Sequence, residues 1–163
     1  MTPIANSSIL IALSSIGELG LLYRRFPAGI RIPQRVWEEV VEEGEGQVGS
    51  EEVASAQWID VCEVKGMDRV ALLAMELDEG EAEAIALCCE LQAGLVLLDE
   101  KDARRTARHL GLRVLGTVGV LIWAKSKGLV SSLREQLDAL QERGAFRLGR
   151  DVYTKAPETV GEA

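Results

Sequence analysis

The stretch from residue 77 to residue 121, LDEGEAEAIALCCELQAGLVLLDEKDARRTARHLGLRVLGTVGVL, predicts the fold of this chain. Two short apolar runs, Leu95–Leu98 and Val114–Leu115, alternate in it with three segments of helical period. This alternation is typical of a parallel sheet whose strands are joined by crossover helices. Ligands bind such sheets at the carboxyl ends of the strands. Asp99 follows the first apolar run and Thr117 follows the second, and each begins the next predicted helix at this end of its strand. We therefore expect a functional crevice at this edge of the sheet.

Length and composition predict one globular domain. The 163 residues are 47% hydrophobic and 27% charged, and no apolar run approaches the roughly 18 residues of a membrane span. The opening residues, MTPIANSSIL, lack a basic segment before their apolar part, which argues against a secretory signal. Cys62, Cys88 and Cys89 make no metal-ligand spacing, so we expect free thiols in a reducing cytoplasm. We assign residues 1–150 to the domain and residues 151–163 to a partly ordered tail.

The net charge limits the kinds of partner that the chain is expected to bind. Eighteen basic and 26 acidic residues give a net charge of −8, which disfavours a broad nucleic-acid-binding surface. Either a basic partner covers the acidic surface, or carboxylates gather around a cation. His109 is the only histidine, so a zinc site or a histidine-based triad has little support. The glycine pattern at Gly44–Gly49 follows a Glu-rich helix and no strand, so we interpret it as a surface loop.

The rest of the chain continues the alternation of strands and helices. Asn6, Ser7 and Ser8 are favoured helix N-caps and separate a short apolar entry from a helical pattern. The elements predicted elsewhere are a strand at 3–5, a helix at 9–22, a strand at 30–32, a helix at 33–43, an edge strand at 58–64, a helix at 68–77 and a long helix after residue 131. Together they predict an α/β fold in which crossover helices join the strands of a parallel sheet.

Glu81 has two interpretations. It follows Asp78 at the spacing of a capping pair, and both acids are favoured by a helix dipole. On a helical wheel Glu81 also shares the packed face with Ile85, whereas Glu83 and Glu90 lie on the opposite, solvated side. An acid on a packed face needs a hydrogen-bond donor or a metal ion as a partner.

Two further acidic clusters are ambiguous in the same way. Asp99, Glu100 and Asp102 stand within four residues, which suits either a divalent cation or an ordinary acidic helix start. Glu38 and Glu39 flank the apolar face of their helix about symmetrically, so periodicity does not choose between them.

The order of these motifs resembles the PIN-domain superfamily, and within it the compact prokaryotic proteins related to VapC-type toxins. The matching pieces span roughly residues 3–130 and read ANSSILIAL, IPQRVWEEV, LDEGEAEAIAL and LVLLDEKDARRTARHLGLRVLGTVGVL. The resemblance implies a three-layer α/β/α fold with a central, mainly parallel sheet of about five short strands in the order 3-2-1-4-5. It also implies a ribonuclease in which acids at the strand ends hold one or two Mg²⁺ or Mn²⁺ ions that activate water against a phosphodiester.

The resemblance assigns roles to individual residues of this chain. Catalytic roles fall on Glu39, Glu81 and Asp99. The implied metal ligands are these three with Asn6, Glu100 and Asp102, supporting hydroxyls are Ser8 and Thr117, and RNA contacts come from Arg104, Arg105 and Lys125. One position departs from the family, because Asn6 stands where the first motif usually has Asp. Its amide offers an oxygen to a hard cation but no negative charge, which favours weaker metal binding.

Three hypotheses follow. The first is a Mg²⁺- or Mn²⁺-dependent endoribonuclease acting as a toxin, restrained by a small antitoxin with a basic segment. The second, favoured by Asn6, is a PIN-like binding module with weakened catalysis. The third is a receiver-like or phosphatase-like domain, which needs an Asp-x-Asp after the first strand that Asn6-Ser7-Ser8 does not provide. An exposed apolar patch among Trp37, Trp123 and the Leu133–Leu140 stripe would support a homodimer.

Overall fold

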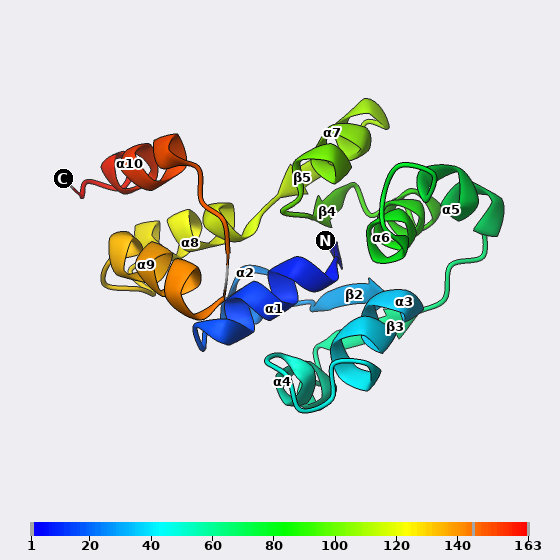
Figure 1. Cartoon of the computed structure of the whole chain (residues 1–163), viewed down its shortest axis with the longest axis horizontal. Coiled ribbons are helices and arrows are strands. Elements are labelled where there is room, and N and C mark those ends of the chain that lie inside the picture. The colour runs from blue at the N-terminus through cyan, green and yellow to red at the C-terminus, as the bar shows by residue number, and fades with distance from the viewer. Residues whose placement is uncertain (1, 145, 163) are drawn as a thin grey trace.

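Five short parallel strands form one sheet in the order β3-β2-β1-β4-β5. The computed structural model describes residues 2–144 and 146–162, and helices cover both faces of the sheet (Figure 1). The strands are β1 (Ile4–Ala5), β2 (Ile30–Pro33), β3 (Ile59–Cys62), β4 (Leu95–Leu97) and β5 (Arg113–Leu115). The predicted three-layer α/β/α fold and its strand order are confirmed.

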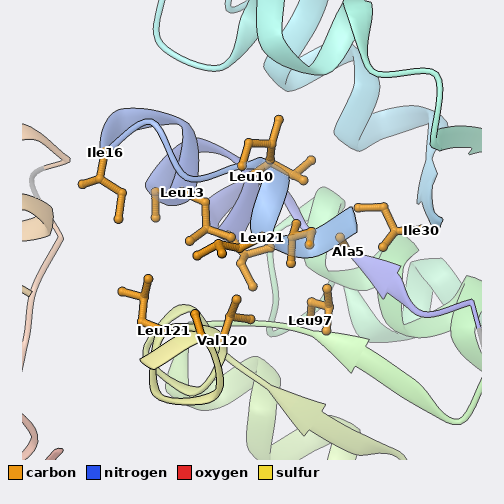
Figure 2. Close-up of a cluster of buried hydrophobic side chains, with 14 of the residues drawn as sticks. Ala5, Leu10, Leu13, Ile16, Leu21, Ile30, Leu97, Val120 and Leu121 are labelled. Atoms are coloured by element: carbon orange, nitrogen blue, oxygen red, sulfur yellow. The ribbon is translucent and has the colours of Figure 1, made fainter. Parts of the chain in front are cut away.

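Alternating side chains of the central strands divide the core in two. Ala5 and Leu97 point to one face, where Figure 2 shows them beside Leu10 and Val120 of the covering helices. Their neighbours along the strands, such as Ile4, belong to a separate buried cluster on the other face. Side chains of a strand alternate between the faces of a sheet, so strands apolar at every position need helices on both sides.

The first helical layer packs on the face of Ala5 and Leu97. It consists of α1 (Ser7–Ser15), α2 (Gly20–Arg25), α3 (Gln34–Trp37), the π-helical turn η1 (Glu38–Glu42), α4 (Ser50–Ser55), α8 (Thr117–Ser126) and α9 (Leu133–Arg143). The second layer, on the face of Ile4, consists of α5 (Met67–Leu73), α6 (Glu79–Glu90) and α7 (Lys101–His109). No helix in the described ranges is long and apolar enough to cross a membrane.

Several boundaries differ from the prediction. The helix expected at 9–22 is broken at Gly17, whose φ of 72° ends α1 before α2 begins. The caps of α7 and α8 lie one residue away from those predicted, at Glu100 and Gly116 instead of Asp99 and Thr117. Residues Arg150–Thr159 form a further helix, α10, that the sequence pattern did not predict.

The apolar stripe of α9 does not form a surface patch. Leu133, Leu137 and Leu140 are fully buried in the main core. Trp37 and Trp123 are half-buried and pack against the same core. The prediction of an exposed apolar patch on this stripe is therefore wrong, because α9 packs on α1 and α8 and carries α10 as well.

A substitution at Gly29 tests how strongly the edge strand β3 is held against β2. Its φ is 93°, and a Cβ there would collide with the carbonyl oxygen of Trp58, which accepts a hydrogen bond from Ile30 N at the start of the β2–β3 pairing. Gly29→Ala should lower the free energy of unfolding by more than about 2 kcal/mol. Gly46→Ala is the matched control, because Gly46 has a φ of 80° and open space around it, and it should cost only about 1 kcal/mol. Urea unfolding measures both, and equal losses would contradict the collision.

Candidate metal centre at the carboxyl edge of the sheet

The strand order reverses between β1 and β4, and the sheet edge at this reversal is the position of the expected crevice. The chain leaves β1 toward β2 on one side and leaves β4 toward β5 on the other, so the helices that follow diverge at this point. Asn6 directly follows β1, and its backbone N–H donates to the carbonyl of Leu97 at 3.1 Å. The start of α6 packs over the same strands. Polar side chains from three separate segments are thereby brought to one edge of the sheet.

Asn6 and Glu39 meet beside Gly80. A Cβ placed on Gly80 would lie 3.2 Å from Asn6 Oδ1 and would overlap Glu39 Oε1. Gly80 therefore lets these two oxygens approach the backbone of α6 where any other residue would displace them. Both oxygens are shielded from water, and neither accepts a hydrogen bond among the described residues. The structure thus distinguishes Glu39 from Glu38, whose carboxylate instead accepts from Arg35 Nη1 at 3.3 Å.

Glu81 stands next to Gly80 and is only 6% exposed. One of its oxygens accepts from Asp78 N at 3.1 Å, while Glu81 N donates to Asp78 Oδ1 at 2.7 Å, so the predicted capping pair is present. Burial raises the pKa of Glu81 to about 7, and the neighbouring charges of Asp78, Glu100 and Glu39 add to this rise, although the hydrogen bond from Asp78 N opposes it. Capping and a buried position in the crevice therefore coexist in one side chain.

The pKa of Glu39 is also raised to about 7. Burial is the main cause, the charge of Asp78 adds to it, and the guanidinium of Arg35 opposes it. Arg35 Nε lies 3.9 Å from Glu39 Oε1 and 3.3 Å from Glu79 Oε2. At neutral pH, Glu39 and Glu81 are thus close to half-protonated, and a bound cation would favour their ionised forms.

The oxygen atoms at this point are suitable ligands for a hard divalent cation. A buried acceptor without a donor costs free energy, and a cation at the meeting point of Asn6 Oδ1 and Glu39 Oε1 would satisfy both atoms. Mg²⁺ and Mn²⁺ prefer such carboxylate and amide oxygens. Across residues 2–144 and 146–162, however, no three acidic, histidine or cysteine side chains form a group able to hold a metal. The candidate centre is therefore two glutamates and one amide.

Asp99 is held by a different partner. Its carboxylate accepts from Thr117 N at 2.7 Å and from Thr117 Oγ1 at 2.6 Å. Burial raises the pKa of Asp99, while these two hydrogen bonds and the charge of Arg104 oppose the rise. Arg104 Nη1 and Asp99 Oδ1 both lie against Gly116. Asp99 and Thr117 thus act as a pair that fixes the start of α8 at the crevice.

The other acids of the predicted cluster also have local partners. Glu100 caps α7 by accepting from Ala103 N at 3.0 Å, and Asp102 pairs with Arg105 at 2.7 Å on the surface. The structure therefore does not gather Asp99, Glu100 and Asp102 into one group of metal ligands. Of these three, Glu100 is the one whose charge raises the pKa of Glu81.

The remaining predicted residues lie at different distances from the crevice. Ser8 follows Asn6 in the first turn of α1, and its hydroxyl is buried without a described partner. Lys125 lies at the far end of α8, where its Nζ donates to Ser131 O at 2.6 Å and pairs with Glu162 at 3.5 Å. Lys125 therefore ties α8 to the segments that follow it.

Two residues of the site were missed by sequence reasoning. Gly80 was not considered, although a glycine inside a first helical turn is a signal of close approach by another group. Arg35 was also missed, although its spacing to Glu38 and Glu39 on one helix is that of an ion pair. One prediction from the helical wheel was wrong, because Glu83 is half-buried and accepts from Arg35 N at 3.3 Å.

Comparison with known proteins gives one match. A family model described as a PIN domain, DUF3368, matches residues 2–162 of the chain. No curated protein and no solved structure matches it.

The raised pKa of Glu81 predicts a pH-dependent stability. The folded chain keeps the proton of Glu81 up to about pH 7, whereas the unfolded chain releases it near pH 4.5, so stability falls as pH rises through this window. The shift corresponds to at most roughly 3 kcal/mol. Glu81→Gln keeps the capping acceptor and removes the charge, so it should be more stable than the wild type at pH 8 and should flatten the pH dependence.

Urea unfolding at several pH values between 4.5 and 8 measures this effect. Glu142→Gln, at an exposed glutamate of α9, is the matched control and should follow the wild type. A pH dependence of Glu81→Gln that equals the wild type would show that Glu81 is not the group that resists ionisation.

Proposed function

The chain belongs to the PIN-domain family, and from this membership and the geometry of the crevice we propose that it is a divalent-metal-dependent ribonuclease. PIN domains are nuclease-type folds that generally use divalent cations and act on RNA. The observation that carries the proposal for this chain is the meeting beside Gly80 of two buried oxygens, Asn6 Oδ1 and Glu39 Oε1, that accept no hydrogen bond from the described residues.

The ligand set we propose is Asn6, Glu39 and Glu81. A Mg²⁺ or Mn²⁺ ion bound there supplies an activated water and positive charge for phosphodiester hydrolysis. Glu39 and Glu81 bind the cation in their ionised forms, so binding displaces protons near neutral pH and affinity rises with pH. Asp99 acts as a positioning residue in this scheme, because its carboxylate holds Thr117 and the first turn of α8.

RNA cleavage and thermal stability test the proposal together. The wild type should cleave single-stranded RNA with Mn²⁺ and not with EDTA, and Glu39→Gln should lower the rate more than about 10-fold. Mn²⁺ should also raise the melting temperature of the wild type by mass action, and the rise should shrink in Glu39→Gln. Glu142→Gln should behave as the wild type in both measurements. Equal cleavage and equal Mn²⁺ stabilisation in Glu39→Gln and wild type would contradict the ligand set.

A second candidate is a PIN-like binding module with weakened catalysis. Asn6 favours it, because the amide at this buried position contributes no charge to neutralise the cation. Asn6→Asp separates the two candidates. For a weakened centre, the added carboxylate should tighten Mn²⁺ binding, measured by calorimetry, and should produce cleavage that the wild type lacks. If the wild type already cleaves RNA and Asn6→Asp changes the rate little, the binding-module candidate is wrong.

The identity of the partners is a finer part of the proposal. The net charge of −8 supports a partner with a basic segment, as a small antitoxin would have. A toxin role in the cytoplasm and a homodimer stay predictions from the sequence, and the buried α9 stripe gives the homodimer no support.

A further inference from the structure

A groove with a volume of about 540 Å³ lies between α8 and the C-terminal segment of the chain. One wall is built from the end of β5 and the start of α8, and the other from residues 146–159, which include α10. Asp99 and Arg104 also line the groove. Because Asp99 directly follows β4, the groove includes a residue of the sheet edge at which the candidate metal centre lies.

The charges around the groove differ from those of the chain as a whole. Three cations line it, Arg104, Arg147 and Lys155, against two acids, Asp99 and Asp151. With both carboxylates ionised, the lining residues still carry one excess positive charge. A chain with a net charge of −8 thus presents a local surplus of positive charge here, which favours an anionic ligand.

Between these charges the walls are apolar. The apolar lining residues include Val118 and Ile122 of α8 and Phe146 and Leu148 of the C-terminal segment. Gly119 also lines the groove, and a Cβ at this position would collide with the side chain of Leu115. A concave apolar site with a few polar groups is the usual form of a ligand pocket, and aromatic side chains in a cationic groove are typical of single-stranded nucleic-acid binding.

The outer wall of the groove is anchored to the domain. Tyr153 OH of α10 donates to Asp138 Oδ1 of α9 at 2.7 Å. Glu162, just after α10, accepts from Leu133 N at 2.6 Å and from Arg134 N at 3.1 Å, which satisfies two N–H groups at the start of α9. Because both ends of α10 are fixed in this way, the groove is preformed, and a ligand need not order it.

We propose that this groove binds one nucleotide of a single-stranded RNA, adjacent to the stretch of RNA at the metal centre. The base lies between Val118 and Phe146, and the flanking phosphates contact Arg104, Arg147 and Lys155. The volume is sufficient for one nucleotide, and the continuity with Asp99 places it on the strand that reaches the crevice. The inference rests on the proposed function, because it takes RNA as the substrate of that same site.

Binding of a fluorescently labelled 12-nucleotide single-stranded RNA in EDTA, followed by anisotropy, tests the groove apart from cleavage. The double variant Arg147→Ala/Lys155→Ala should weaken binding by about fivefold or more, and so should Val118→Trp, which fills the groove without a change of charge. Arg24→Ala/Arg108→Ala is the matched control, because both arginines are exposed and lie outside the groove. Their substitution removes the same amount of positive charge as Arg147→Ala/Lys155→Ala. Its affinity should stay within about twofold of the wild type. Melting curves establish that each variant is folded.

The outcomes separate the two proposals. Losses in the control as large as those in Arg147→Ala/Lys155→Ala, or wild-type affinity in a folded Val118→Trp, would overturn the groove as a nucleotide site. If the groove variants also cleave RNA in Mn²⁺ at the wild-type rate, the ribonuclease stands without the groove. If RNA binds in a groove-dependent way but Mn²⁺ gives no cleavage, the groove stands and the ribonuclease fails. A protein ligand that binds the groove while RNA does not would also overturn it.

Discussion

The parallel pairing of β1 with β4 is the contact on which the site depends. Ile4 pairs with Val96 and Ala5 with Leu97, so Asn6 and Asp99 leave the sheet side by side at one edge. The two strands send their chains in opposite directions, and the helices that follow part above this edge. Both strands are apolar at every position and buried on both faces, so a slip in their register would misplace two cores at once. The position of the crevice is thus set by hydrophobic burial and not by its polar residues.

At the crevice itself, in contrast, the burial of acidic side chains lowers the stability of the fold. Burial disfavours the charged forms of Glu39 and Glu81, and the charge of Glu39 raises the pKa of Glu81 further. A fold that keeps such groups loses stability at neutral pH, which is expected where the positions are retained for a ligand. Asp99 differs, because Thr117 satisfies its carboxylate through two hydrogen bonds. The acids at this sheet edge therefore differ in their partners: Asp99 accepts two hydrogen bonds from Thr117, Glu81 accepts one from Asp78 N, and Glu39 Oε1 accepts none among the described residues.

Sequence patterns were sufficient for the fold and for the segments that reach the site. The apolar runs predicted β4 and β5, and the capping spacing of Asp78 and Glu81 is present in the structure. Side-chain partners were less accessible, because they depend on contacts between elements far apart in the sequence. The turn of Asp99 toward Thr117 needs the β4–β5 pairing, and the closeness of Glu39 to Gly80 needs the packing of η1 against α6. Helix α10 escaped prediction because Pro157 and its mixed charges hide its helical period.

The capping pair of Asp78 and Glu81 has a consequence for recognition at the crevice. Because Asp78 N holds one oxygen of Glu81, folding has already removed most of the rotamer freedom of this side chain. A flexible glutamate would lose about 1.5–2 kcal/mol of side-chain conformational entropy when a ligand fixed it. For Glu81 this loss occurs when the helix forms and not when a ligand binds. The start of α6 thus holds the Glu81 carboxylate in one orientation before any ligand binds.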